Sequence, residues 1–254
     1  MQNDHEFSGK SILITGAASG IGAACVQFLA QRGASRLILT DIDPRALAAL
    51  DLPCETSRIA GDVADPAHWE DVSASLGELD HAVLNAGIAD GSPITELDFA
   101  DWRRVLSTNL DGAFLSLAAA MRAIKEGGSI VLTASVSGMK AEPGTAAYGC
   151  SKAGVLQLAR VAAKEAAPRR VRVNAIAPGG VDTPIWDQTP FFQDLVTEHG
   201  GDRQAALDAM AAMATPLGRY ATSAEIAGQV AFLLSDAAAT ITGTALVSDG
   251  GYSL

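Results

Sequence analysis

The sequence predicts a doubly wound α/β fold, in which a parallel β-sheet of about seven strands carries helices on both faces. Short β-branched runs alternate along the chain with longer stretches whose apolar residues recur at helical spacing. The runs are apolar at consecutive positions, as in Ile12-Leu13-Ile14, and such strands are buried on both faces. A length of 254 residues fits one large domain, and no Pro- or Ser-rich linker interrupts the alternation. We therefore expect residues 1–254 to form a single domain.

Local patterns place the individual elements. Runs of β-branched and apolar residues predict strands at Ser11–Thr15, Arg36–Thr40, Asp80–Leu84, Ser129–Thr133 and Val171–Ala177. Helical spacing of apolar residues predicts helices at Ile21–Arg32, Phe99–Ile124 and Tyr148–Ala166.

The stretch 184–216 breaks the alternation and is predicted to be an inserted helical lid. Large apolar residues stand there among polar ones: Trp186, Phe191, Phe192, Met210 and Met213. Such residues either contact an apolar substrate or pack against the domain or a neighbouring subunit. Both roles are open at this point.

The charge balance of the chain is acidic. The 18 Lys and Arg residues stand against 29 Asp and Glu, which gives a net charge of −11. This charge repels nucleic-acid phosphates and anionic lipid heads. The first residues are polar, and no long uncharged apolar stretch follows them, so export and membrane insertion are not expected. The composition therefore excludes nucleic-acid and membrane partners and predicts a cytoplasmic protein.

The cysteines and histidines indicate neither a disulfide framework nor a metal site. Cys25, Cys54 and Cys150 are odd in number and lack CxxC spacing. The 4 histidines are scattered without the spacing of metal ligands. We expect buried free thiols and no metal ion.

A glycine-rich turn follows the first predicted strand and opens directly into a helix. It reads Thr15-Gly16-Ala17-Ala18-Ser19-Gly20-Ile21-Gly22, a GxxxGxG spacing rather than GxGxxG. Glycines permit a tight turn and a close backbone approach, and a helix N-terminus offers unpaired N–H groups, so the turn suits a pyrophosphate. A purely structural glycine turn is the alternative. If the turn binds a dinucleotide, the contacts come from Gly16, Ser19, Gly20, Ile21 and Gly22.

Asp41 ends the second predicted strand, 19 residues after Gly22. A carboxylate at this position can accept hydrogen bonds from the adenosine ribose hydroxyls and repels a 2′-phosphate. Arg36 stands at the other end of the strand, and the glycine turn contains no Lys or Arg. The sequence therefore favours NAD over NADP, with Asp41 and Ile42 at the adenosine end. A helix cap is the alternative role of Asp41, although Asp43 is nearer to the following helix.

Two further strand ends hold candidate contacts to the cofactor. Asp62 and Val63 follow the third strand, and Asn85-Ala86-Gly87 follows the fourth. Ligands of doubly wound sheets bind beyond the carboxyl ends of the strands, where these residues are expected to lie. Turn formation alone would also explain either group.

A Tyr/Lys pair and a serine are the candidate catalytic residues. Tyr148 and Lys152 are four residues apart at the start of a predicted helix, so both emerge on one face, while Cys150 points elsewhere. Removing a proton from a secondary alcohol near neutral pH needs a phenol with a pKa below its usual value of about 10, and a lysine ammonium with a cationic nicotinamide would lower that pKa. Ser135, with Ser137 as a rival, follows the fifth strand and can hydrogen-bond the reacting oxygen. The alternatives are a solvated helix surface for the pair and a turn residue for the serine.

With these residues in view, the chain resembles the short-chain dehydrogenase/reductase family, in its branch with a single Rossmann domain. The resemblance runs through the whole chain, and the motifs follow one another in the order of the family: the TGAASGIG turn, Asp62, Asn85-Ala86-Gly87, Asn109, Ser135, Tyr148-x-x-x-Lys152, Pro178-Gly179, Gly243 and Ser248-Asp249-Gly250-Gly251. Ala134 before Ser135 and Ser107-Thr108 before Asn109 depart from the common pattern, and neither departure removes a catalytic group.

The resemblance implies a catalytic tetrad. In it Tyr148 is the acid/base and Ser135 positions the substrate oxygen. Lys152 holds the nicotinamide ribose and tunes Tyr148, and Asn109 supports a proton-relay water. The resemblance also implies that the nicotinamide end is received by Pro178, Gly179, Val181 and Thr183. A homotetramer is implied as well, with the helices Phe99–Ile124 and Tyr148–Ala166 and the strand Leu246–Ser248 at interfaces.

The leading interpretation is an NAD-dependent dehydrogenase that interconverts a secondary alcohol and a ketone. The apolar lid favours a cyclic or aromatic substrate, and the expected substrate contacts are Ser135, Ser137, Tyr148, Gly179 and Trp186. An NADPH-linked reductase of 3-oxoacyl carrier-protein thioesters is the alternative within the family, although Asp41 disfavours its cofactor. A dinucleotide-sensing protein without turnover is a further alternative, which an intact tetrad disfavours.

Overall fold

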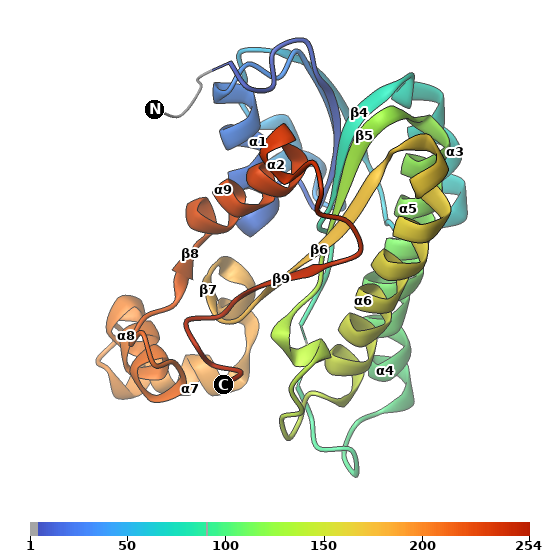
Figure 1. Cartoon of the computed structure of the whole chain (residues 1–254). Helices are drawn as coiled ribbons and strands as arrows, with labels where there is room; N and C mark the ends of the chain where they lie inside the picture. The colour runs from blue at the N-terminus through green and yellow to red at the C-terminus, as the bar shows by residue number, and fades with distance from the viewer. Residues whose placement is uncertain (1–4, 90) are drawn as a thin grey trace.

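The chain forms one large parallel sheet in the computed structural model, which describes residues 5–89 and 91–254. Its seven strands lie in the order β3-β2-β1-β4-β5-β6-β9, with helices on both faces (Figure 1). This arrangement confirms the predicted doubly wound α/β class. The strands are β1 (Ser11–Thr15), β2 (Arg36–Asp41), β3 (Glu55–Ala60), β4 (Leu79–Leu84), β5 (Ile124–Thr133), β6 (Arg172–Pro178) and β9 (Ala245–Ser248).

The helices that cover the sheet connect the strands in sequence. They are α1 (Gly20–Gln31), α2 (Pro44–Ala48), α3 (Pro66–Leu76), α4 (Phe99–Leu106), α5 (Gly112–Ala123), α6 (Ala146–Ala166) and α9 (Ser223–Leu234). Within the part of the chain that the structure describes, no helix is long and apolar enough to cross a membrane.

The central strands are buried because their side chains alternate between two apolar cores. From β1, Leu13 points into the core under α3, α5 and α6. Ile12 and Ile14 point the other way, into the core under α1 and α9. All three side chains are 0% exposed, and burying each one contributes about 1.5–3 kcal/mol. The apolar character of consecutive residues thus specifies a helical layer on each face.

The predicted helix Phe99–Ile124 is interrupted in the structure. α4 gives way to a π-helical turn at Ser107–Asp111 before α5 begins, and Ile124 is the first residue of β5. Within this turn, the side-chain Oδ1 of Asn109 accepts a hydrogen bond from the Ile88 N–H at 2.8 Å, and Nδ2 donates to the Ile88 carbonyl at 2.9 Å. π turns inside helices frequently occur at functional sites. The prediction of one regular helix is wrong because apolar spacing continues across the turn and does not reveal it.

The segment 184–216 consists of short helical pieces with a small core of their own. A 3₁₀ turn at Pro184–Gln188 precedes α7 (Pro190–Glu198) and α8 (Arg203–Ala214), and the short strands β7 (Val181–Asp182) and β8 (Ala221–Thr222) pair at its base.

The apolar residues of this segment divide into two groups. Trp186, Phe192 and Met210 pack together in the small core. Phe191 and Met213 are 64% and 77% exposed. The first group therefore stabilises the segment itself, and the second is free to contact something outside it.

The three cysteines differ in exposure. Cys25 is buried in α1, and burial raises the pKa of its thiol to about 12. Cys54 is partly buried, and Cys150 is exposed. The expectation of buried thiols is therefore right for Cys25 and wrong for Cys150, because the helix turns position 150 away from the face that carries Tyr148 and Lys152.

Candidate active site

The glycine turn has a backbone shape that requires glycine. Gly16 and Gly20 have φ angles of +62° and +51°, in the left-handed region that side chains disfavour. A Cβ on Gly22 would lie 1.8 Å from the Gly16 carbonyl oxygen, so the turn and the start of α1 are in direct backbone contact. Ser19 precedes α1 in an extended conformation, and its side chain makes no capping bond. The first N–H groups of the helix are therefore available to an anion.

Asp41 lies beside the glycine turn at the end of β2. Its Oδ2 accepts a hydrogen bond from the Ala18 N–H at 2.9 Å, and its Oδ1 accepts one from the Asp43 N–H at 3.0 Å. These bonds hold a carboxylate at the carboxyl edge of the sheet, where a ribose hydroxyl can reach it. Asp43 is the residue that caps α2, through the first N–H groups of that helix. Ile42, between the two carboxylates, is 72% exposed.

The candidates after β3 and β4 are held in different ways. Asp62 accepts a hydrogen bond from the Ala64 N–H at 2.9 Å. A bond of this kind, from a backbone N–H two residues further on, stabilises a turn. The buried Val63 accepts a hydrogen bond from the Trp69 indole through its carbonyl. By contrast, Asn85 is bonded to the glycine turn itself, because its Nδ2 donates to the Gly16 carbonyl at 3.3 Å.

The hydroxyl of Thr15 joins the ends of β1 and β4. It accepts hydrogen bonds from the N–H groups of Asn85 and Ala86, at 2.9 and 3.0 Å. A Cβ on Gly16 would lie 2.8 Å from the Cα of Ala86, so the two turns touch. The turn after β4 thus packs against the glycine turn and is hydrogen-bonded to the residue that precedes it.

Gly87 brings this turn against the catalytic candidates. A Cβ at Gly87 would lie 3.2 Å from both the Asn109 Oδ1 and the Lys152 Nζ. Lys152 is 3% exposed, and its ammonium donates to the Thr133 carbonyl at 2.9 Å. Asn109 is 1% exposed, and its Nδ2 also donates to the Ser151 hydroxyl at 3.1 Å. The end of β4, the π turn, the end of β5 and α6 therefore meet at one point.

The Ser135 hydroxyl lies close enough to the Tyr148 phenol to lower the pKa of that phenol. Ser135 precedes a 3₁₀ turn at Val136–Gly138, and its Oγ accepts a hydrogen bond from the Ser137 N–H at 3.1 Å. The same Oγ lies 3.5 Å from the carbonyl oxygen of Pro178, at the end of β6. Of the two serines that the sequence offers, Ser135 is the one that acts on the Tyr148 pKa, and Ser137 supports it through the backbone.

Burial dominates the pKa values of the Tyr148 and Lys152 side chains. It raises the pKa of the Tyr148 phenol, and the hydrogen bond with Ser135 offsets part of this rise. It lowers the pKa of the Lys152 ammonium to about 8. The Lys152 Nζ lies 5.6 Å from the centre of the Tyr148 ring, and in the protein alone burial keeps the pKa of the phenol above its usual value. The expected lowering of this pKa, which includes a cationic nicotinamide, stays a prediction. A phenolate at neutral pH needs further positive charge in the site.

The residues of the implied nicotinamide end lie between β6 and the segment 184–216. A Cβ on Gly20 would lie 3.3 Å from the Thr183 methyl group, so this end meets the glycine turn. The Val181 carbonyl accepts a hydrogen bond from the Trp186 indole N–H at 2.8 Å. The Trp186 ring also stacks on Tyr220, with centroids 5.9 Å apart. Trp186 is thus held by residues on either side of segment 184–216, and its predicted contact with substrate stays a prediction.

The residues present fit a dinucleotide cofactor. The glycine turn leaves open the space that side chains would fill, the start of α1 suits a pyrophosphate, and the Asp41 carboxylate suits a ribose. From this turn, the carboxyl edge of the sheet leads past Gly87 to the buried Lys152. The arrangement can therefore hold a dinucleotide beside a tyrosine and serine able to move a proton.

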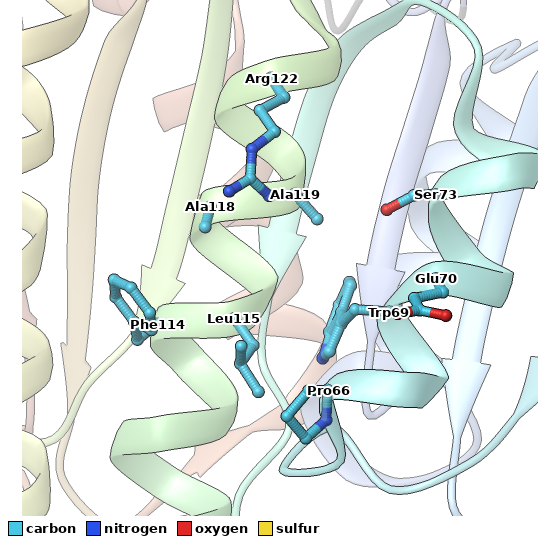
Figure 2. Close-up of a pocket in the computed structure, with 9 residues that line it drawn as sticks. All are labelled: Pro66, Trp69, Glu70, Ser73, Phe114, Leu115, Ala118, Ala119 and Arg122. Atoms are coloured by element: carbon cyan, nitrogen blue, oxygen red, sulfur yellow. The ribbon is translucent and has the colours of Figure 1, made fainter.

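A separate groove lies away from these residues. It has a volume of about 320 Å³ and lies between α3 and α5, and Figure 2 shows Trp69, Phe114 and Arg122 among its walls. The Trp69 indole is already bonded to Val63, and Phe114 is 55% exposed. Its lining includes none of the catalytic candidates, so chemistry at Tyr148 does not involve this groove.

Sequence reasoning missed three residues that hold the site together. Thr15 binds the turn after β4, Thr133 accepts from Lys152, and the fully buried Ser151 bonds to Asn109. Ser151 comes three residues after Tyr148, so helical spacing could have placed it on the same face. Thr133 acts through its backbone carbonyl, for which the residue type gives no signal.

Comparison with known proteins shows similarity over almost the whole chain. A family model described as enoyl-(acyl carrier protein) reductase matches residues 16–253. The chain is 38% identical over 258 residues to cis-4-hydroxycyclohexanecarboxylate dehydrogenase of Sinomonas cyclohexanicum, with 97% of this chain and 98% of that protein covered. It is 36% identical over 252 residues to a 3-oxoacyl-[acyl-carrier-protein] reductase of Escherichia coli strain K12, with 96% and 98% covered.

The fold agrees with these similarities. The crystal structure of carveol dehydrogenase from Mycobacterium avium in complex with NAD matches with a TM-score of 0.90 at 30% identity, and the match covers 98% of this chain and 99% of that one. Sequence motifs, sheet order and relatives thus agree from the glycine turn to the last strand. The chain therefore belongs to the short-chain dehydrogenase/reductase family of nicotinamide-dependent oxidoreductases.

Proposed function

We propose that this protein is an NAD-dependent dehydrogenase that interconverts a cyclic secondary alcohol and the corresponding ketone. The observation that carries the proposal is the placement of Ser135 close to Tyr148, with the buried Lys152 Nζ 5.6 Å from the centre of the tyrosine ring. Asn109 lies near Lys152, since a Cβ on Gly87 would be 3.2 Å from both the Asn109 Oδ1 and the Lys152 Nζ. A protein that only binds a dinucleotide has no need of a tyrosine, a serine, a lysine and an asparagine gathered at one end of the cofactor site.

The preference for NAD is proposed from Asp41. Its carboxylate is held between the glycine turn and the start of α2 by hydrogen bonds from Ala18 and Asp43. A 2′-phosphate at the same place would face this negative charge. Arg36 does not neutralise it, because its guanidinium binds the Leu76 carbonyl and faces Glu55 instead. The M. avium relative, whose structure contains NAD, is consistent with this choice.

The proposed reaction begins with proton transfer from the alcohol to Tyr148. Ser135 holds the carbinol oxygen, and Tyr148 takes its proton as the oxygen becomes a carbonyl. When bound, the cofactor would supply the acceptor for the hydride of the carbinol carbon and a positive ring that favours the phenolate. The protein's part is to place Ser135 and Tyr148 on the oxygen within a desolvated site.

Lys152 is placed to pass the proton from Tyr148 towards solvent. Its ammonium has a pKa of about 8, so it exchanges protons near neutral pH. The bond to the Thr133 carbonyl keeps Nζ near the tyrosine ring, and Gly87 leaves room for Asn109 beside it. We propose that Lys152 and Asn109 carry the proton from Tyr148 towards solvent during oxidation.

The substrate class is proposed from the relatives and the apolar segment. Hydroxycyclohexanecarboxylate and carveol, which name two relatives, are both ring alcohols. We propose that segment 184–216 serves as a lid of the single catalytic domain, with the exposed Phe191 available to a bound ring. Ser137, Gly179 and Trp186 remain predicted substrate contacts beside Ser135 and Tyr148.

Two alternatives are weighed against this proposal. An NADPH-linked reductase of 3-oxoacyl carrier-protein thioesters is favoured by the similarity to the E. coli enzyme, but the placement of Asp41 disfavours NADPH. A dinucleotide sensor is disfavoured by the contact between Ser135 and Tyr148. The predicted homotetramer finds support in the exposed Phe114 beside the groove of α5. A cytoplasmic location stays a prediction from composition.

Absorbance of the reduced nicotinamide at 340 nm, a property of the cofactor, tests the proposal. The protein is incubated with NAD⁺ or NADP⁺ and a panel of cyclic, aliphatic and aryl secondary alcohols, and separately with NADH or NADPH and a 3-oxoacyl thioester. We expect reduction of NAD⁺ by ring alcohols. Preferential oxidation of NADPH by 3-oxoacyl thioesters would favour the first alternative, and cofactor binding without turnover of any substrate would favour the second.

A further inference from the structure

The segment 250–254 is folded against the rest of the protein. The N–H of Leu217, at the end of the proposed lid, donates to the Gly250 carbonyl at 3.1 Å. Asp249, which precedes the segment, accepts a hydrogen bond from the Gly251 N–H at 2.9 Å. The bond from Leu217 attaches one side of the segment to the end of the lid, and the bond from Gly251 stabilises the turn at the start of the segment.

A second set of contacts attaches this segment to the loop after Ser135. The Lys140 ammonium donates to the Tyr252 carbonyl at 3.0 Å and lies 3.8 Å from the centre of the Tyr252 ring. Lys140 also pairs with the Glu142 carboxylate at 3.0 Å. The Glu142 carboxylate in turn lies close enough to the Tyr252 phenol for each group to shift the pKa of the other. Lys140, Glu142 and Tyr252 thus form a closed set of contacts, which we call the clasp.

The clasp is joined to the catalytic candidates through the chain and through Gly179. Its lysine and glutamate belong to the loop that joins Ser135 to Tyr148. Asp249, three residues before the clasp tyrosine, lies over Gly179, where a Cβ would come within 2.8 Å of the aspartate Cβ. Figure 1 shows the end of the chain between α7 and this loop. A substrate held by the serine and tyrosine therefore has the segment as a neighbour.

We propose that the clasp fixes segment 250–254 as a wall of the substrate pocket and that Tyr252 is a specificity-determining residue whose ring limits the size of the substrate. The inference rests on the proposed function, because it requires that Ser135 and Tyr148 hold the alcohol oxygen. A fixed wall on this side favours compact ring alcohols over those with a bulky group far from the carbinol carbon.

The three side chains of the clasp have no net charge at neutral pH. The charge of Lys140 faces that of Glu142. Burial and the hydrogen bond to Glu142 raise the pKa of the Tyr252 phenol to about 12, so the phenol remains protonated at neutral pH. Tyr252 also lies near Tyr220, which contributes to the raised pKa of the Tyr252 phenol. Tyr220 in turn stacks on Trp186. The wall is therefore aromatic and uncharged, which suits the apolar part of a substrate.

Hydrogen–deuterium exchange tests the clasp without any need for turnover. Lys140→Met keeps the aliphatic stem but removes the charge, and we expect amide exchange in residues 250–254 and 139–145 to become about tenfold faster. Lys164→Met, at an exposed position on α6, is the matched control and should leave exchange in both regions unchanged. Unchanged exchange in Lys140→Met would overturn the clasp.

Comparison of two alcohols tests the specificity role. In Tyr252→Ala, we expect the kcat/KM ratio of 4-tert-butylcyclohexanol to cyclohexanol to rise about tenfold, while NADH affinity stays within about twofold. Tyr252→Phe keeps the ring and should keep the preference for the smaller alcohol, which separates the ring from the hydroxyl.

The outcomes distinguish the two levels of the inference. An unchanged ratio in Tyr252→Ala overturns the specificity role of Tyr252. A wild-type protein that oxidises no alcohol in the panel overturns the proposed function and the specificity role with it. The exchange experiment on Lys140→Met still decides whether the clasp holds the segment.

Discussion

The Nδ2 of Asn109 donates a hydrogen bond to the hydroxyl of Ser151 at 3.1 Å. The Ser151 hydroxyl in turn donates to the Tyr148 carbonyl at 2.7 Å. Ser151 is 0% exposed, so neither bond is replaced by water. This serine therefore connects the π turn to the first turn of α6, and it fixes the position of Asn109 relative to Tyr148.

Ser151→Ala is predicted to lower kcat about tenfold, since losing a buried hydrogen bond costs about 1–1.5 kcal/mol. NADH affinity should stay within about twofold, because Ser151 does not lie at the glycine turn. The pH dependence of kcat is measured alongside, because misplacement of Asn109 would change proton transfer and not only stability. A variant with wild-type kcat and pH profile would show that Asn109 is placed by its bonds to Ile88 alone.

Tyr148→Phe is predicted to lower kcat by about 10²–10⁴-fold, the usual contribution of a general acid or base. The variant keeps the ring that fills the site, so NADH should bind with nearly unchanged affinity in a fluorescence titration. Tyr220→Phe is the matched control, since this tyrosine stacks on Trp186 and has no assigned part in proton transfer. Retention of kcat in Tyr148→Phe would remove the tyrosine from the acid/base role.

Asp41→Ser is predicted to reduce the ratio of kcat/KM for NAD⁺ to that for NADP⁺ by about tenfold or more. The substitution removes the charge that would face a 2′-phosphate. Asp43→Ser is the matched control, because Asp43 caps α2 two residues away and a serine can still cap. The cofactor ratio is measured for both variants. An equal ratio in Asp41→Ser and wild type would place the discrimination elsewhere.

The sheet could be predicted from sequence because a strand buried on both faces has apolar residues at consecutive positions. In β1 the residues Ile12 to Ile14 are apolar without alternation, and each one enters a core. The π turn at Asn109 has no comparable pattern in the sequence. Its side-chain bonds run to Ile88, which is distant in sequence. Local periodicity describes strands and helices well, and it does not describe contacts between them.

In the candidate site, too, local patterns could be predicted from sequence and contacts between distant residues could not. Asp41, Tyr148 and Lys152 were found from their positions after strands or within one helix, because these positions are local. The role of Asn109 came only from resemblance to a family, and Thr133 contributes a backbone carbonyl. The direction of the Tyr148 pKa could not be derived from a neighbouring lysine, since it depends on how deeply the fold buries the phenol.

Phe114→Glu is predicted to weaken or abolish self-association. Phe114 is 55% exposed on α5 beside the groove between α3 and α5. A charge in a contact between copies would be left without a partner. Phe191→Glu, at a 64% exposed position of the lid, is the matched control. Light scattering after size exclusion should give a tetramer for wild type and the control. A monomeric wild type would contradict the predicted assembly.

His81 makes the stability of the protein depend on pH. The side chain is 8% exposed, its Nδ1 lies 2.8 Å from the Ser129 hydroxyl, and its ring lies edge-on to Phe7. Burial lowers the pKa of this imidazole from 6.5 to about 4. The folded protein therefore keeps His81 neutral at a pH where the unfolded chain already protonates it.

The sign of the effect follows from this lowered pKa. The stability is fully present above pH 6.5 and is lost as pH falls from 6.5 towards 4, because only the unfolded state gains the proton there. The loss attributable to His81 is about 3 kcal/mol over that range. His81→Gln retains a hydrogen-bonding side chain but cannot titrate, so its free energy of unfolding in urea should fall less steeply with decreasing pH, at equal protein concentration. Parallel curves for His81→Gln and wild type would show that other groups cause the acid sensitivity.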